Sequence, residues 1–582
     1  MYAAINPQLA IALQQASASA ASGQFSDAER HYRWALTLAP DDPRIAISLG
    51  LVLRQMQRPA EAKMLFSGVV QRHPALAEAH YGLGLACQDM MELAGAEAAY
   101  RAALAHNPGF LPAALGLASV CNFAGRPDEA LDLLKEAATP DPRLAAAIEH
   151  QRGNAQQLKD QNEAALAHFE RALALEPGLA GAAQSRATAL QSLGRDEEAL
   201  AALRQVLKDN PADLMAHDTL NRMLYRLKRD DEFLRSYDEA AAKFPPTPHF
   251  ALAKAALLVR SERHAEALEL YDYALKLAPG EPVVLQGRAM AQLGLKQVEA
   301  AIASYEEGLR RAPDDINMLT SAAAAYLTGG APKKAEAAAL RALKLAPAAQ
   351  SGLALLGTAW RLMGDAREHD LHRYDDFIQV FDLEPPAGFS DMTTFCGELD
   401  RWLDTQHSDK REHIDQTLRG GTQTMGNFLS PGRNPLLDGL RQRIEEAVRR
   451  YVAGLPQDEH HPFLRWRAPD VRFAGSWSSR LKDRGFHVNH LHSEGWISSA
   501  FYVAVPETVH DLTARQGWIK FGEPSFDIGL DDPVRRAVQP RVGRLVLFPS
   551  YTWHGTVPFH APQNRTTIAF DAVPANDRFG RA

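Results

Sequence analysis

The chain has 582 residues, of which 46% are hydrophobic and 23% charged, and its formal net charge is −8. One hydrophobic core does not support a chain of this length, so we expect at least two domains or a solenoid that grows by repetition. Its lysines and arginines are scattered rather than clustered in a basic stripe, which argues against nucleic acid as a partner.

The cysteines and the hydrophobic runs favour a reducing compartment. The chain has only Cys87, Cys121 and Cys396, whose spacing suggests neither a disulfide framework nor a thiolate metal site. The first residues lack the basic start and continuous apolar stretch of a signal peptide, and no run of about 18 apolar residues follows. We therefore expect a cytoplasmic protein without a membrane partner.

Prolines recur through the first 350 residues with a period of 34, apart from one step of 35. A small residue stands twelve positions before most of them, and a large ring often stands eight positions before. Proline ends a helix because it has no N–H to donate. Each period therefore predicts two antiparallel helices, with the small residue where their backbones approach and the ring between neighbouring units. The prolines are Pro40, Pro74, Pro108, Pro142, Pro177, Pro211, Pro245, Pro279, Pro313 and Pro347.

Some periods depart from this pattern. Phe233 replaces the small residue in one of them, and the ring is replaced by Leu134, Leu203 and Ala339 in others. We expect these units to pack less regularly or to bend the superhelix.

The period resembles the tetratricopeptide repeat family. Leu49-Gly50 and Leu83-Gly84 match the Leu-Gly pair of that family's first helix, and residues 1–350 hold about ten units. The resemblance implies a superhelix whose concave surface binds protein segments, so we expect a protein or peptide partner. Residues 351–375 predict a capping helix and a linker, before Pro385-Pro386 break the helical pattern.

From residue 376 onward the pattern changes to short strand-like runs separated by turns. Several short strands of alternating or apolar pattern predict a jelly-roll type of sandwich or barrel. We therefore expect a multidomain α + β chain, in which an α-solenoid precedes a double-stranded β-helix (jelly roll) with flanking helices at residues 376–582. The strand-like runs are 471–477, 497–505, 518–521, 544–548 and 566–570.

Histidines stand next to these strands. His490 and His492 precede the run at 497–505, and His554 follows the run at 544–548. Side chains at positions i and i+2 share one face of a strand, and a rolled sheet can bring a third ligand from a distant strand. Non-haem iron that activates O2 needs such a small ligand set together with open positions.

These residues, followed by Arg565-Thr-Thr567, resemble the iron(II)- and 2-oxoglutarate-dependent oxygenases, in particular a bacterial branch that often follows tetratricopeptide repeats. The resemblance implies Fe(II), O2 and 2-oxoglutarate as co-substrate, with ascorbate as an addition in vitro. It implies that the metal ligands and catalytic residues are His490, His492 and His554. It also implies that Arg565 and Thr567 hold the distal carboxylate of 2-oxoglutarate, with Tyr502 as a further candidate.

Position 492 departs from the usual motif of this family, which is His-x-Asp or His-x-Glu with a distant histidine. One assignment is a site of three histidines. Another shifts the motif, so that His492-Ser-Glu494 supplies the usual pair together with His554. A third has two histidines with water completing the set. The spacing to the following strand favours His490 and His492 over Glu494.

The leading functional hypothesis is a dioxygenase that hydroxylates a protein or peptide recruited by the repeats. The alternative is a tetratricopeptide scaffold whose C-terminal domain is inactive or binds metal as cupins do. The Arg565-x-Thr567 pair speaks against a scaffold, because an inactive site has no use for an oxoacid anchor.

Overall fold

The computed structural model describes residues 6–179, 181–407, 412–424, 427–531, 533–575 and 579. The chain splits into two compact units, Met1–Ala202 and Leu203–Ala582. This division falls inside the repeats, and the second unit holds the later repeats together with the C-terminal strands. The proposed domain limits at residues 350 and 376 stay a prediction.

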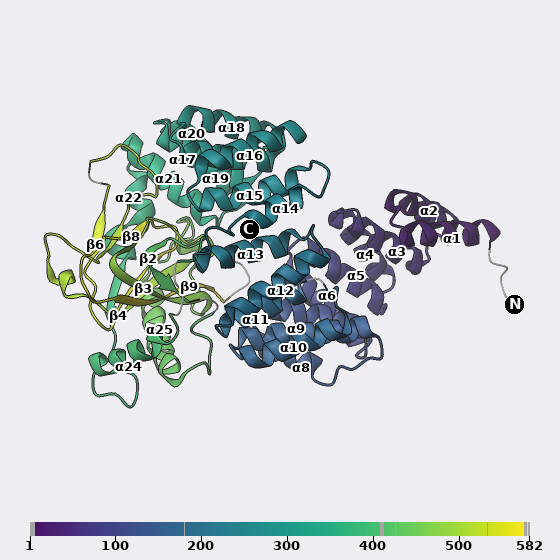
Figure 1. Ribbon diagram of the computed structural model, residues 1–582, viewed down its shortest axis with the longest axis horizontal. Helices are drawn as coiled ribbons and strands as arrows, with labels where there is room; N and C mark the ends of the chain where they lie inside the picture. Colours follow the sequence, from purple (N-terminus) through teal and green to yellow (C-terminus); the bar gives the residue numbers. More distant parts are fainter. Residues whose placement is uncertain are drawn as a thin grey trace. The chain divides into compact units, whose positions relative to one another are not determined.

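In the described residues, helices α1 to α20 follow one another as ten pairs, coloured purple to teal in Figure 1. The helical solenoid predicted from the 34-residue period is confirmed. The bounds are α1 Pro7–Ala21, α2 Phe25–Leu38, α3 Pro43–Gln55, α4 Pro59–Arg72, α5 Ala77–Asp89, α6 Leu93–His106, α7 Leu111–Phe123, α8 Pro127–Leu134, α9 Pro142–Leu158, α10 Asn162–Leu175, α11 Ala182–Ser192, α12 Asp196–Asp209, α13 Leu214–Arg226, α14 Arg235–Ala241, α15 Pro248–Arg260, α16 His264–Leu277, α17 Pro282–Gly294, α18 Val298–Arg311, α19 Ile316–Thr328 and α20 Pro332–Leu345.

Most of the phased prolines follow the second helix of a pair, as Pro40 follows α2. Pro142 does not, and for this proline the predicted role is wrong. It opens α9, where Asp141 caps the helix by accepting a hydrogen bond from the Arg143 N–H at 2.9 Å. Proline suits this place because the N–H groups of the first helical turn have no partner within the helix.

Two second helices are short. Helix α8 has 8 residues and α14 has 7, whereas α2 has 14. These are the units where Leu134 replaces the ring and Phe233 replaces the small residue. Helices α12 and α20 keep 14 residues although Leu203 and Ala339 replace their rings, so the loss of a ring does not by itself shorten a helix.

In four units of the described chain, the ring packs against glycines of first helices. Phe66 in α4 is fully buried. A Cβ built on Gly50 in α3 would stand 2.6 Å from the Phe66 ring, and one built on Gly82 in α5 would stand 2.3 Å from it. The ring therefore occupies the space between consecutive units, as the sequence predicts. The same close approach joins Tyr100 to Gly84 and Gly116, Phe169 to Gly153, and Tyr271 to Gly287.

Two antiparallel sheets follow the repeats. The larger has the strand order β1-β7-β4-β9-β3-β2, and the smaller has the order β6-β5-β8. The predicted C-terminal region of antiparallel sheet is confirmed. The remaining bounds are α21 Gln350–Met363, α22 Arg367–His372, α23 Tyr374–Phe377, β1 Gln379–Asp382, α24 Met392–Asp404, β2 Leu418–Gln423, α25 Pro435–Gly454, β3 Val471–His487, β4 Ile497–Ala504, β5 Ile519–Phe521, β6 Arg536–Val538, β7 Arg544–Pro549, β8 His554–Thr556 and β9 Arg565–Pro574.

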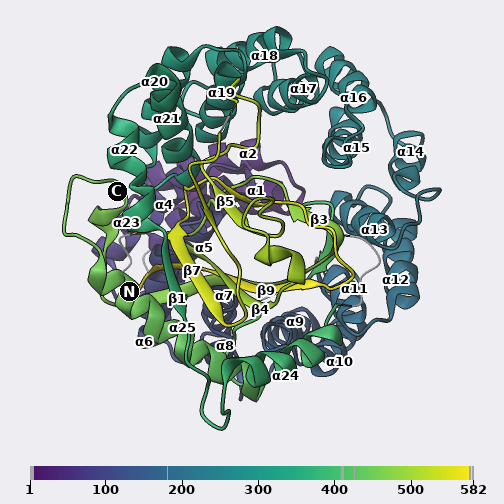
Figure 2. The same cartoon turned by 90° about the vertical axis from the view of Figure 1, so that its left-hand side faces the viewer.

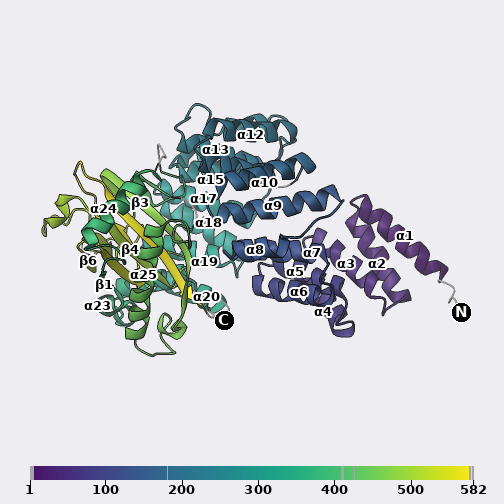
Figure 3. The ribbon, with the colours of Figure 1, turned by 90° about the horizontal axis from the view of Figure 1, so that it is seen from below.

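The two faces of the larger sheet have different neighbours. Phe501 of β4 and Phe570 of β9 join a buried cluster with residues of α24 and α25, which lie against this face in Figures 2 and 3. Tyr502, the next residue of β4, packs instead with Phe521 of the smaller sheet. Because side chains alternate across a strand, the second face of the larger sheet is turned toward the smaller sheet.

Helix α21, which follows the last pair, is tied to the strands. The Trp553 indole N–H donates a hydrogen bond to Thr358 Oγ1 of α21 at 3.1 Å, and the Tyr551 hydroxyl donates to the Leu371 carbonyl at 2.6 Å. The helix predicted to close the repeats therefore also anchors the residues just before His554.

Cys87, Cys121 and Cys396 are buried and unpaired. Burial raises the pKa of the Cys121 thiol to about 11 and that of Cys396 to about 12, so both thiols stay protonated at neutral pH. Across the residues that the structure describes, no helix combines the length and the apolar character needed to cross a membrane.

We expect Gly82→Ala to destabilise the compact unit Met1–Ala202 by about 1–3 kcal/mol, because the added methyl group overlaps the Phe66 ring. Gly68→Ala in α4 is the matched control, since nothing lies within 4 Å of a Cβ built there and alanine favours a helix over glycine by about 0.5–1 kcal/mol. Urea unfolding of the intact protein, with hydrogen exchange of the α4–α6 amides, measures both variants. Equal stability of the two would contradict the packing described.

Candidate metal centre

Three histidines from two distant segments converge. His490 and His492 lie between β3 and β4, and His554 opens β8. One ring nitrogen from each lies within 4.8 Å of the others. The rings of His490 and His554 are 4.2 Å apart between centroids. The sequence-predicted set of His490, His492 and His554 is thus brought together, in an arrangement that could hold a metal ion.

The Nδ1 atom of each ring has a hydrogen-bond partner. His490 Nδ1 is 2.8 Å from the Val488 carbonyl, and His554 Nδ1 is 3.0 Å from the Thr552 carbonyl. Carbonyl oxygens only accept hydrogen bonds, so both Nδ1 atoms carry the hydrogen. His492 Nδ1 lies 2.6 Å from a carboxylate oxygen of Asp571, which also accepts. Fixing Nδ1 in this way leaves each Nε2 to face the others.

The Nε2 atoms of His490 and His492 are 3.2 Å apart. Two nitrogen lone pairs at that distance repel unless a positive charge, a proton or a metal ion, lies between them. A proton can join only two nitrogens, whereas a metal ion can bind all three. Ligand nitrogens about 2.1 Å from a metal and at right angles lie about 3 Å apart, so the spacing fits a shared cation.

Burial keeps the rings of His490 and His554 neutral. It lowers the pKa of His490 to about 3, with the neighbouring His492 as a second cause. Burial also lowers the pKa of His554 well below its usual value, again helped by the other histidines. Neutral imidazole is the form that binds metal, so His490 and His554 are ready to act as ligands at neutral pH.

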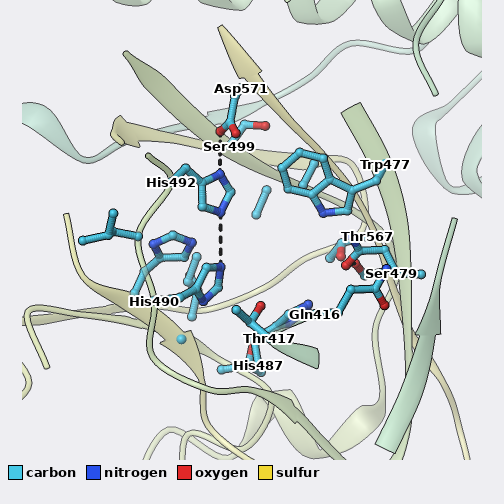
Figure 4. A pocket seen from close by; sticks show the side chains of 18 of the residues that line it. Gln416, Thr417, Trp477, Ser479, His487, His490, His492, Ser499, Thr567 and Asp571 are labelled. Atoms are coloured by element: carbon cyan, nitrogen blue, oxygen red, sulfur yellow. Dashed lines mark hydrogen bonds and ion pairs between the residues drawn. The ribbon is translucent and has the colours of Figure 1, made fainter. Parts of the chain in front are cut away.

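A cavity of about 300 Å³ opens beside the histidines (Figure 4). One wall is a single face of β9, where every second residue lines the cavity: Arg565, Thr567, Ala569 and Asp571. The period of two is that of a strand. Trp477 of β3 lies across the cavity from the histidines in Figure 4, and its ring centroid is 5.4 Å from that of His492.

Arg565 is a buried cation at the end of this wall. Its side chain is 2% exposed, and its Nε donates a hydrogen bond to the Gly517 carbonyl at 2.9 Å. Among the residues that the structure describes, it has no acidic partner. Burial of the charged form lowers its pKa. A buried charge without a counter-ion is costly, so this guanidinium is suited to an anionic ligand.

Thr567 and Tyr502 lie next to Arg565 in different ways. Thr567 is buried and lines the cavity. Tyr502 pairs with Thr567 across the sheet, but its side chain packs among the residues between the sheets and is not part of the cavity lining. Arg565 Cζ is 5.0 Å from the centroid of the Tyr502 ring. The Tyr502 ring therefore packs against the Arg565 guanidinium without lining the cavity itself.

Glu494 does not join the histidines. It is exposed at the mouth of the cavity and is not part of the group of converging ligand atoms. The geometry thus agrees with the sequence preference for His492 over Glu494, and the ligand assignment itself stays a prediction.

Sequence reasoning missed Asp571, Trp477 and His487. Asp571 could have been found, because it continues the alternation that begins at Arg565 and Thr567. Trp477 and His487 belong to β3, which carries no motif that points to the site. His487 lines the cavity, with its Nδ1 3.3 Å from Thr556 Oγ1, and burial lowers its pKa well below the usual value.

Comparison with protein families matches residues 475–571 to the family described as "Putative 2OG-Fe(II) oxygenase". Two tetratricopeptide repeat families match residues 89–149 and 258–325, and 13–62 and 185–248. The chain therefore contains tetratricopeptide repeats, and its C-terminal region matches the family described as putative 2OG-Fe(II) oxygenases. The family match covers the histidines and Asp571.

No curated protein matches the sequence. Among solved structures, a tetratricopeptide repeat protein from Parabacteroides merdae is 11% identical, covers 49% of this chain and all of its own, and has a TM-score of 0.33. A thermophilic TPR protein from Thermus thermophilus is 26% identical over 32% of this chain and 100% of its own, with a TM-score of 0.29. Yeast Tom70 is 13% identical over 62% of this chain and 96% of its own, with a TM-score of 0.31.

We expect His554→Ala and His492→Ala to lower Co(II) affinity by about 100-fold or more, because loss of a ligand should cost more than the roughly 10–100-fold caused by loss of an outer partner. Glu494→Gln should leave the affinity unchanged, since Glu494 is exposed and apart from the group. Calorimetric titration and the visible absorption of bound Co(II) measure all three. Strong binding by His492→Ala and weak binding by Glu494→Gln would assign the third position to Glu494.

Proposed function

We propose that the protein is an Fe(II)- and 2-oxoglutarate-dependent dioxygenase that hydroxylates a protein or peptide side chain. The observation that carries this proposal is the presence, in one cavity, of three converging imidazole nitrogens and a buried arginine that has no acidic partner among the described residues. The match of this region to the oxygenase family supports it.

His490, His492 and His554 would hold the iron. Imidazole nitrogen suits Fe(II), and three ligands on one side leave positions open. When bound, iron supplies the redox chemistry by which 2-oxoglutarate, O2 and a substrate C–H become succinate, CO2 and a C–OH. The protein's own part is to fix the three nitrogens: their Nδ1 partners set the orientation of each ring before any metal arrives.

Arg565 and Thr567 would bind 2-oxoglutarate. A guanidinium matches a carboxylate in a bidentate pair, and Thr567 adds a hydroxyl two residues along the same face of β9. The Tyr502 ring behind Arg565 restricts the arginine side chain, which favours one orientation of the bound co-substrate. Because the oxoacid carboxylate replaces a missing counter-ion, its binding also offsets the cost of the buried cation.

The strand order supports a jelly roll. Two antiparallel sheets share the apolar cluster that contains Tyr502 and Phe521, and the histidines bridge one side of the space between them. We propose that the repeats deliver the substrate, since tetratricopeptide arrays commonly bind protein segments. A cytoplasmic location is part of the same proposal, and the unpaired buried cysteines are in keeping with it.

With Fe(II) and ascorbate, we expect the purified protein to convert 2-oxoglutarate slowly to succinate without added substrate. Arg565→Gln should raise the KM for 2-oxoglutarate about 10- to 150-fold, because charge-assisted hydrogen bonds contribute about 1.5–3 kcal/mol. Co(II) affinity should not change in this variant. Arg484→Gln is the control, since that side chain is 80% exposed.

Chromatography of succinate and the Co(II) titration described above give the two measurements. A protein that binds metal but never consumes 2-oxoglutarate is a cupin-like metal protein or a scaffold, and the proposal then fails. A substrate is identified when a candidate peptide gains the mass of one oxygen atom only with 2-oxoglutarate present.

A further inference from the structure

The three histidines differ in what holds them. His490 and His554 donate from Nδ1 to backbone carbonyls, at 2.8 and 3.0 Å. His492 instead has the Asp571 carboxylate as its partner, at 2.6 Å, as the dashed line in Figure 4 shows. Of the three candidate ligands, His492 therefore has a hydrogen-bond partner that carries a full negative charge.

The Asp571 carboxylate is built into the sheet. The residue is 8% exposed, and the same oxygen that faces His492 accepts a hydrogen bond from Ser498 Oγ of β4 at 2.6 Å. Within the described part of the chain, Asp571 pairs with no lysine or arginine, and its one ion-pair partner is His492. A buried carboxylate without a cation is costly. The interaction with His492 is therefore the one that can stabilise the negative charge of Asp571.

The rest of the cavity provides no comparable charge. Asp415 and Glu494 also line it, but both are exposed at its mouth. Three neutral imidazoles would leave the two positive charges of a divalent metal uncompensated by the protein, beside the buried Arg565. Among the described residues that line the cavity, Asp571 is the buried carboxylate that can offset them.

We propose that Asp571 is a positioning residue that completes the metal centre from outside the coordination sphere. By accepting the hydrogen of His492 Nδ1 it directs Nε2 toward the metal, and through this bond it contributes the negative charge that a carboxylate ligand would supply. This inference rests on the proposed function only in taking the three histidines as metal ligands, and it does not depend on 2-oxoglutarate turnover.

The test compares Asp571→Asn, Asp571→Ala and a control in the intact protein. Asparagine keeps an oxygen that can accept the Nδ1 hydrogen but removes the charge, whereas alanine removes both. Asp415→Asn is the charge-matched control, because it removes one negative charge from the mouth of the same cavity. Co(II) affinity is measured by calorimetry, and the visible spectrum of bound Co(II) reports the ligand field. In the metal-free protein, 15N NMR of labelled histidine reports which ring nitrogen of His492 carries the hydrogen.

We expect both Asp571 variants to lose about 10- to 100-fold in Co(II) affinity and to shift the Co(II) spectrum, with Asp415→Asn unchanged. The metal-free wild type and Asp571→Asn should show hydrogen on Nδ1 of His492, and Asp571→Ala should show a mixture of tautomers. A purely structural role would not move the spectrum of Asp571→Asn.

Wild-type affinity in Asp571→Asn would overturn this proposal and leave the dioxygenase proposal standing. Absence of succinate formation, with the expected order of metal affinities, would overturn the dioxygenase proposal alone. A wild-type protein that binds no divalent metal would overturn both.

Discussion

Two backbone hydrogen bonds between His490 and His554 are the constraint on which the site depends. The His490 N–H donates to the His554 carbonyl at 2.8 Å, and the His554 N–H donates to the His490 carbonyl at 2.9 Å. This bridge joins the loop after β3 to the first residue of β8, so the two rings project from neighbouring backbone positions. A further hydrogen bond from the His492 N–H to the Ser550 carbonyl, at 3.1 Å, joins the same two segments, so ligands distant in sequence are held close together.

The surroundings hold this bridge from several sides. The Trp553 indole joins the segment before His554 to α21, and the Tyr551 hydroxyl joins it to Leu371 of α22. Strand β9 forms one wall of the cavity and presents both Arg565 and Asp571 on one face. A single strand thus brings the candidate oxoacid anchor and the carboxylate behind His492 into one fixed register, because side chains on one face of a strand keep their spacing.

The repeats follow a different rule. In several units a ring fills the space beside a glycine, as Phe66 does between Gly50 and Gly82. Each unit contacts only its neighbours. Such local rules are readable in sequence, which is why the proline period predicts the ten helix pairs of the described chain. They also fail locally, as at Pro142, where a proline expected to end one helix opens the next.

The sequence by itself determined the helical solenoid, the antiparallel strands that follow it, and the candidate residues His490, His492, His554, Arg565 and Thr567. Each of these depends on a period or a short motif, and such signals lie within a few residues or recur at fixed spacing. Only the tertiary structure separated His492 from Glu494 in space, placed Tyr502 behind Arg565 rather than in the cavity, and brought Asp571 to His492. The reason is physical: these contacts cross between strands that are distant in sequence, and their geometry is decided by strand pairing, which no local pattern encodes.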